Sequence, residues 1–463
     1  MTTTPVTFRR STAAVAKVDG PSMPVARPLT APPGFHVMAK PTGAICNLDC
    51  AYCYYLSKES LYPGDRFRMT LELMETYVRQ LMESQTAPEV TVAWQGGEPT
   101  LMGLSFFREV VKATRRHRRP GQQVTHTIQT NATLLNEDWA AFLAEEGFLV
   151  GVSIDGPPEI HDAYRVDKHG RETSARVIAG LDLLRQHNVK YNILCSVHAA
   201  NADHPIEVYR YLRDDCGARF IQLIPIVEPL SGDAAPGAVS DRSVTPERWG
   251  RFLSAIFDEW LVRDVGSVFV QTFDASLAAW LGVPPGLCVF SETCGDAVAL
   301  EHNGDVYSCD HFVEPDHLLG NIRQTHLVEL VASEQQRAFG AAKRDSLPGF
   351  CRRCDVLFVC QGECPKNRFL ISPDGEPGLN YLCDGYKQFF HHVDGPMRIM
   401  ADLLRAGRLA ADVMTVFARV PRNALCPCGS GAKAKKCHGD PRGRQMEHAE
   451  RRHDGSCDGS PSS

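Results

Sequence analysis

Six short apolar segments, rich in β-branched residues, alternate with helical stretches over residues 35–228. In chain order they are FHVMAK, VTVAW, THTIQT, LVGVSI, YNILCSV and FIQLIPIV. A helical pattern follows most of them; NEDWAAFLAEEG, for example, offers Asn136 as N-cap and Gly147 as stop. Strands that alternate with helices form a parallel sheet with right-handed crossovers. Six such units predict an α/β fold, a curled and partly open (β/α)6 barrel, rather than a doubly wound sheet.

The seventeen cysteines of this 463-residue chain are the second constraint on its fold. The N-terminus has no apolar h-region, so we expect a cytoplasmic protein without a secretory signal. In that compartment clustered cysteines bind metal or do redox work more often than they form disulfides. All but three lie in clusters. We interpret the isolated Cys195, Cys216 and Cys457 as buried apolar residues or a tail residue.

The first cluster of cysteines directly follows the first predicted strand. Cys46, Cys50 and Cys53 are spaced CxxxCxxC, at the strand end where α/β barrels carry their active sites. Three thiolates can hold three irons of a four-iron cluster, which normally takes four cysteines. The remaining iron is then open to a ligand, as in a catalytic zinc site. Zinc itself fits less well, because no fourth Cys or His lies nearby at zinc-finger spacing.

This motif after a first strand resembles the signature of the radical S-adenosylmethionine (SAM) enzymes, in which SAM chelates the open iron. Later strand ends extend the resemblance through WQGGEPT, IQTNATLL, VSIDGP and AYRVD. It implies that the GGEP backbone meets the SAM amino group, that Ser153 contacts the ribose and that Arg165 pairs with the carboxylate. The implied cofactor-binding residues are Tyr52, Gln95, Gly96, Gly97, Glu98, Gln129, Asn131, Ser153 and Arg165.

A second set of eight cysteines follows: Cys288, Cys294, Cys309, Cys351, Cys354, Cys360, Cys364 and Cys383. Eight thiols are the number that two fully ligated iron–sulfur clusters need. Two structural zincs are the simpler alternative. The pattern resembles the SPASM extension of radical SAM enzymes, and most of all the anaerobic sulfatase-maturating enzymes, through GDVYSCDHFVEPDHLLGNI, CRRCDVLFVCQGECPKNRF and LNYLCDGYKQFFHHVD. The resemblance runs over residues 35–420.

That resemblance implies three [4Fe-4S] clusters and a reaction. One auxiliary cluster takes Cys288, Cys294, Cys309 and Cys364, and the other takes Cys351, Cys354, Cys360 and Cys383. Because the sets interleave, loss of one cluster should unfold both. The reaction oxidises a Cys or Ser of an unfolded sulfatase to Cα-formylglycine, with a flavodoxin- or ferredoxin-type electron donor. Asp310 resembles the general base, and a carboxylate beside charged clusters is expected to have a shifted pKa.

A small basic module, CPCGSGAKAKKCHG, closes the ordered part of the sequence. Cys426, Cys428, Cys437 and His438 supply four ligands, enough for one closed zinc site. The spacing rules out a P-loop. The module resembles the SEC-C motif and suggests a protein partner.

The expected organisation has seven parts. These are a disordered leader (1–34), the barrel (35–240), a helical linker (241–283), the cysteine-rich domain (284–395), a helix (396–420), the zinc module (421–440) and a tail (441–463). The net charge of −6 gives no reason to expect nucleic-acid binding. No apolar run approaches the ~18 residues of a membrane span.

Two other functions compete with the maturase. One is a SPASM enzyme that modifies another ribosomal peptide; the short segment before the barrel leaves no room for the leader-binding domain such enzymes often carry. The other is a non-catalytic multi-zinc scaffold. Metal analysis separates the scaffold, since the enzyme should hold about twelve irons and one zinc per chain.

Overall fold

The computed structural model describes residues 28, 30–230, 235 and 237–438. Most of the expected leader, all of the expected tail and Cys457 lie outside the described residues. Seven strands lie side by side in chain order and all run parallel: β1 (His36–Ala39), β2 (Glu89–Trp94), β3 (Gln123–Thr130), β4 (Leu149–Ser153), β5 (Lys190–Val197), β6 (Phe220–Pro225) and β7 (Phe269–Val270). A doubly wound sheet would reverse its order midway. The predicted α/β barrel architecture is confirmed.

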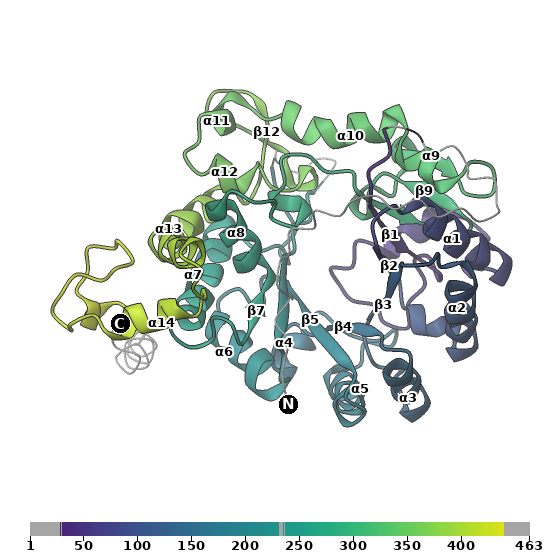
Figure 1. Cartoon of the computed structure of the whole chain (residues 1–463), viewed down its shortest axis with the longest axis horizontal. Coiled ribbons are helices and arrows are strands. Elements are labelled where there is room, and N and C mark those ends of the chain that lie inside the picture. Colours follow the sequence, from purple (N-terminus) through teal and green to yellow (C-terminus); the bar gives the residue numbers. More distant parts are fainter. Residues whose placement is uncertain (1–27, 29, 231–234, 236, 439–463) are drawn as a thin grey trace, which may run out of the picture.

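Helices between the strands cover one side of this curved sheet (Figure 1). They are α1 (Leu71–Ser84), α2 (Leu104–His117), α3 (Glu137–Glu145), α4 (Pro158–His161), α5 (Ser174–Gln186) and α6 (Pro205–Arg210). The predicted cap of α3 is present, since the Asn136 side chain accepts a hydrogen bond from the Trp139 N–H at 3.0 Å. Gly147 follows the helix with φ +66°, a conformation that favours glycine.

The cysteine-rich segment continues the barrel sheet, which the sequence did not reveal. Strand β8 (Ala297–Leu300) pairs in parallel with β1, and β9 (Asp305–Tyr307) and β10 (Leu318–Asn321) extend it antiparallel. Such short strands carry little pattern of their own, and pairing with β1 defines them. The turn between β8 and β9 is therefore brought close to the loop after β1, and there Tyr55 donates a hydrogen bond to Glu301.

The rest of the segment is a layer of short elements beyond the strand ends (Figure 1). It contains α9 (Leu327–Val331), α10 (Glu334–Asp345), α11 (Gly349–Arg352), α12 (Leu357–Cys360), β11 (Leu370–Ile371) and β12 (Pro377–Leu379). No described helix is both long and apolar enough to cross a membrane.

Two expectations about the later helices need correction. Residues 241–283, predicted as a linker, form α7 (Pro246–Arg263), strand β7 and α8 (Gln271–Leu281), and contribute buried aromatic residues to the main core. The helix predicted at 396–420 is two helices, α13 (Cys383–Arg405) and α14 (Asp412–Ala418). Pro396 lies inside α13 rather than at its start, and the chain turns at Gly407 with φ +73°.

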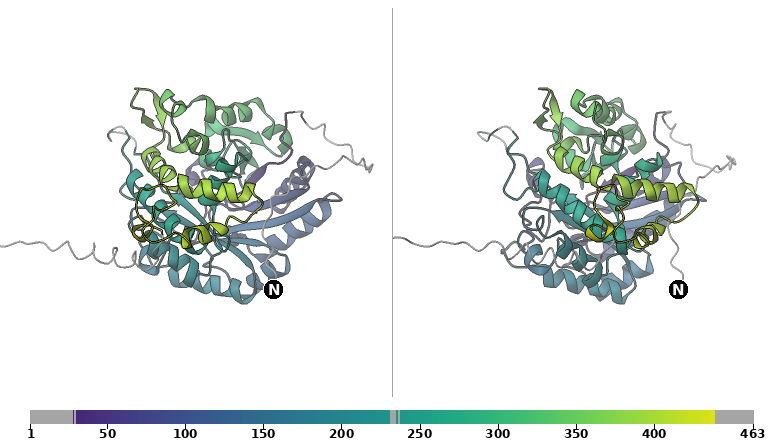
Figure 2. Two further views of the ribbon diagram at one scale, coloured as in Figure 1. Left: turned by 60° about the vertical axis from the view of Figure 1, so that its left-hand side comes forward. Right: turned by 90° about the vertical axis from the view of Figure 1, so that its left-hand side faces the viewer.

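Helices α13 and α14 pack against α7 (Figure 2). One core therefore runs from the barrel into the C-terminal helices. Cys195 and Cys216 belong to it with exposed fractions of 0% and 1%, as expected for apolar packing residues.

Candidate functional site

The loop after β1 carries Cys46, Cys50 and Cys53, all half-buried free thiols. The segment after β2 holds this loop: the Gly97 N–H donates to the Gly43 carbonyl at 2.8 Å, and the Glu98 N–H to the Ile45 carbonyl at 2.9 Å. Gly97 has no room for a side chain, because a Cβ there would lie 2.0 Å from the Ile45 oxygen. An ammonium group of a ligand only donates hydrogen bonds, so it would need carbonyl oxygens of this segment.

Glu98 ties two strand ends together. Its fully buried carboxylate accepts from the Thr100 N–H (3.0 Å), the Thr100 hydroxyl (2.6 Å), the Thr130 hydroxyl (2.8 Å) and the Asn131 N–H (2.8 Å). Burial raises the pKa of Glu98. The side chain therefore acts inside the protein, and only the backbone of this residue is available to a cofactor.

The polar residues at the ends of β3 and β4 form two neighbouring groups. Asn131 Nδ2 lies 3.7 Å from the Cys46 sulfur and donates to the Asn47 side chain at 2.9 Å. Gln129 donates to the Ser153 hydroxyl at 3.0 Å. Gln95 is half-buried at the end of β2. The predicted polar residues thus line the barrel end that carries the first thiols.

A buried aspartate organises two other predicted residues. Asp155 accepts from Arg165 Nε at 2.8 Å, from the Ser196 N–H at 2.9 Å and from the Tyr52 hydroxyl. Burial alone would raise the pKa of Asp155, but Arg165 and then His198 hold it well below its usual range. Tyr52 is therefore buried against Asp155, with Arg165 stacked over its ring at 5.4 Å. The sequence analysis missed Asp155, although it stands in VSIDGP, because a buried aspartate and a turn aspartate have the same pattern.

Asp310 reaches from the loop after β9 to the loop of the first thiols. Its carboxylate pairs with the ammonium of Lys40 and accepts a hydrogen bond from the hydroxyl of Tyr54, which directly follows Cys53. The Lys40 side chain is 3% exposed and the Asp310 side chain 13%. Burial would raise the pKa of Asp310, but Lys40, His311 and Tyr54 together outweigh burial and the net pKa is lowered. The site therefore holds an ionised carboxylate; the sequence analysis missed Lys40 and Tyr54.

The first four auxiliary thiols come together from distant parts of the chain. Cys309 interacts electrostatically with Cys288 and Cys294, and Cys364 with Cys309. Burial, with these neighbours, raises the pKa of Cys309 to about 12. A thiolate in this place needs a cation, which bound iron would supply.

The other four thiols line one small pocket together with Phe350. Cys360 interacts with Cys383 and Cys351, and Cys383 also with Cys354. A sulfur-lined pocket fits a metal cluster with four thiolate ligands. The two groups of thiols match the two predicted ligand sets.

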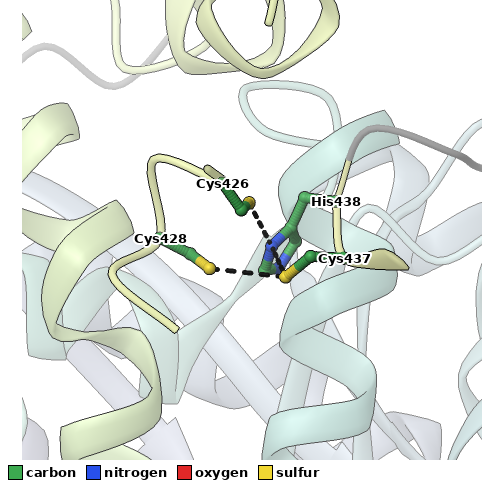
Figure 3. Close-up of side chains that lie close together, drawn as sticks. All are labelled: Cys426, Cys428, Cys437 and His438. Atoms are coloured by element: carbon green, nitrogen blue, oxygen red, sulfur yellow. Dashed lines mark hydrogen bonds between the residues drawn. The ribbon is translucent and has the colours of Figure 1, made fainter. Parts of the chain in front are cut away.

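The C-terminal module brings its four predicted ligands together (Figure 3). The sulfurs of Cys426 and Cys437 lie 3.4 and 3.2 Å from His438 Nδ1, and those of Cys428 and Cys437 lie 3.4 Å apart. Three sulfurs and one nitrogen in this arrangement fit a tetrahedral zinc ion. The other ring nitrogen, His438 Nε2, lies 2.9 Å from the carboxylate of Asp258 on α7. A carboxylate commonly orients a metal-binding histidine in this way.

Comparison with known proteins agrees with this site. Residues 41–212 match the radical SAM superfamily, 288–355 the iron-sulfur cluster-binding SPASM domain and 422–440 the SEC-C motif. The chain is 45% identical to the serine-type anaerobic sulfatase-maturating enzyme of Bacteroides thetaiotaomicron, over 84% of this chain and 95% of that enzyme. It is 32% identical to the cysteine-type enzyme of Clostridium perfringens (strain 13 / Type A), over 78% of this chain and 96% of that enzyme.

A solved structure has the same fold. Native anSMEcpe with bound AdoMet and the Cp18Cys peptide superposes with a TM-score of 0.72 at 31% identity, over 80% of this chain and 99% of that one. These matches exclude the multi-zinc scaffold and favour a sulfatase maturase over an enzyme for another peptide.

Proposed function

The chain belongs to the family of anaerobic sulfatase-maturating enzymes, and we propose how its own residues carry out the reaction of that family. It is a radical SAM enzyme that oxidises a Cys or Ser of a sulfatase to Cα-formylglycine. Cys46, Cys50 and Cys53 would hold the cluster that binds SAM. When bound, that cluster and SAM supply a 5′-deoxyadenosyl radical, which removes hydrogen from the substrate Cβ.

The residues around the first thiols would bind SAM. The carbonyls of the GGEP segment accept from its amino group, Ser153 and Gln129 contact the ribose, and Arg165 pairs with the carboxylate. The position of these groups supports this assignment, because they lie at strand ends around the loop of the first thiols. Hydrogen bonds orient several of them, such as the one from Gln129 to Ser153 and the one from Arg165 to Asp155.

Asp310 would take the proton from the substrate thiol or hydroxyl. The observation that carries this proposal is the contact of Asp310 with Lys40 and Tyr54, which places an ionised carboxylate between the first thiol loop and an auxiliary ligand, Cys309. A carboxylate of lowered pKa is a weak base against a thiol of pKa ~8.5. Proton transfer therefore follows hydrogen removal, because a radical at Cβ makes the neighbouring S–H or O–H more acidic.

The auxiliary thiols, of which Cys309 interacts electrostatically with this aspartate, would hold iron–sulfur clusters able to accept the second electron of the oxidation. A flavodoxin- or ferredoxin-type protein would supply electrons to the first cluster. We place the enzyme in the cytoplasm, where free thiols persist; all sixteen described cysteines are free. The C-terminal module would bind zinc and offer a surface to a protein partner.

A peptide assay tests the function. The full chain, reconstituted with iron and sulfide, is incubated anaerobically with SAM, a reductant and sulfatase-derived peptides carrying Cys, Ser or Ala at the target position. Formylglycine should appear with the Cys or the Ser peptide, together with 5′-deoxyadenosine, and the Ala peptide should stay unchanged. Deoxyadenosine release with unaltered Cys and Ser peptides would show that the proposed substrate is wrong.

A further inference from the structure

Lys343 on α10 is buried beside the auxiliary thiols, with an exposed fraction of 1%. Its Nζ donates to the carbonyls of Cys288 at 2.5 Å and Val289 at 2.9 Å, and also to that of Ser291. A neutral amine has only two N–H donors, whereas an ammonium has three. Three carbonyl acceptors therefore identify this group as a buried ammonium ion.

No carboxylate neutralises this ammonium within ion-pair distance among the described residues. The charges that act on Lys343 are, in order, those of Cys294, Cys288, Arg368 and Glu363. A buried charge without an opposite charge nearby is strongly unfavourable. Two thiols of the first auxiliary set are thus the groups that compensate it most strongly, once they are thiolates of a bound cluster.

A second cation, the half-buried Arg368, interacts with thiols of both auxiliary sets. Its guanidinium donates to the carbonyls of Gly362 (2.8 Å), Gln361 (2.9 Å) and Lys343 (2.5 Å). Among charged groups, Glu363 interacts most strongly with Arg368. Thiols of both sets follow, Cys351 and Cys360 from one and Cys364 from the other. The thiols that interact most strongly with Lys343, Cys294 and Cys288, both belong to the first set, and this difference favours an effect on one cluster.

We propose that Lys343 sets the reduction potential of the auxiliary cluster formed by Cys288, Cys294, Cys309 and Cys364. The inference rests on the proposed assignment of these thiols to an iron–sulfur cluster. A cluster with four thiolates is an anion, and reduction adds one negative charge to it. A fixed ammonium in a medium of low dielectric favours the reduced state. Lys343 therefore makes this cluster a better acceptor for the electron that leaves the substrate.

The test uses the full chain with Cys46, Cys50 and Cys53 changed to Ala, so that only the auxiliary clusters contribute signals. In this background Lys343→Met and Lys343→Gln remove the charge, and Lys343→Arg retains it. Lys112→Met, which removes an exposed lysine on α2, is the matched control. Iron content is measured first. Anaerobic potentiometric titration followed by EPR then gives the potential of each cluster, without substrate or SAM.

Lys343→Met and Lys343→Gln should lower the reduction equilibrium constant of one auxiliary cluster at least about tenfold, which is 59 mV for a one-electron couple. The reduction equilibrium constant of the second auxiliary cluster should change less. In Lys343→Arg and Lys112→Met the constants of both clusters should stay within a factor of about three of the parent values. If both neutral variants lose iron while Lys343→Arg keeps all of it, the positive charge is already needed when the cluster assembles. That result also supports the inference.

Two results would overturn the inference. One is full iron and an unchanged potential in the neutral variants. The other is loss of iron in Lys343→Arg as well, because shape rather than charge would then matter. If the parent chain holds no auxiliary iron, the proposed cluster assignment fails together with the inference. Full iron with unchanged potentials removes only the role of Lys343 and leaves the proposed function intact.

Discussion

The pair formed by Lys40 and Asp310 allows the chemical role of the aspartate to be separated from its structural role. Asp310→Asn removes the negative charge and leaves the Lys40 ammonium buried, with its side chain 3% exposed. Breaking a buried ion pair on one side costs ~3–5 kcal/mol. The asparagine oxygen can still accept a hydrogen bond, so we expect ~3 kcal/mol, roughly a hundredfold in the unfolding equilibrium.

Adding Lys40→Met to Asp310→Asn removes the unpaired charge as well. Replacing a buried ion pair by neutral groups is often neutral or stabilising, so the double variant should regain most of the lost stability. It should not regain peptide oxidation, because the base is still missing. Both variants should keep cleaving SAM. Asp316→Asn, an exposed aspartate of the same loop, is the matched control and should behave as the parent.

Anaerobic thermal unfolding measures the stability of each variant, and mass spectrometry measures formylglycine and 5′-deoxyadenosine in the same preparations. The reasoning is refuted if Asp310→Asn unfolds at the temperature of the parent, because the pair would then be solvated. It is equally refuted if the double variant oxidises peptide at the rate of the parent, because Asp310 would then have no chemical role.

Three further predictions concern other parts of the molecule. Gly97→Ala should lose about four of the twelve irons, because its Cβ displaces the loop of the first thiols. Gly34→Ala should keep all of them, because a Cβ at Gly34 fits at 3.4 Å from the Ala87 Cβ. Asp258→Asn should weaken zinc binding 10–100-fold in a chelator competition, and His392→Ala, which removes the other histidine bound to that carboxylate, should not. Lys40→Met should move the acid limb of peptide oxidation to higher pH. It removes the main group that lowers the pKa of Asp310 against burial, so this pKa rises and protonation begins nearer neutrality; an unmoved limb would contradict this.

The sequence predicted the barrel well, because its evidence is local. Strands such as β2 and β3 alternate fully buried residues with more exposed ones, which gives each a short local pattern. Helices α1 and α3 begin with side-chain caps, at Thr70 and Asn136. Strands β8 to β10 were not predicted, since three or four residues show no period. Their pairing with β1 is a long-range contact, and no local pattern encodes it.

The site was predicted unevenly for the same reason. Cysteines and histidines are scarce enough that their spacing is informative. Lys40, Tyr54 and Asp155 are common residue types at unremarkable positions, and their roles follow only from partners far along the chain. The direction of the pKa shift of Asp310 could not be foreseen, because burial and Lys40 oppose each other and only geometry decides between them.

The four-residue step from Cys360 to Cys364 explains why the two auxiliary sites should behave as one unit. Between them Gln361, Gly362 and Glu363 all have positive φ, at +48°, +67° and +53°. Such a conformation is strained for the two non-glycine residues and persists only when its surroundings enforce it. Arg368 binds the carbonyls of all three residues, and the flanking thiols belong to different ligand sets. In the proposed assignment, metal at both ends would therefore fix the strained segment, and release of either end would remove the constraint on the other.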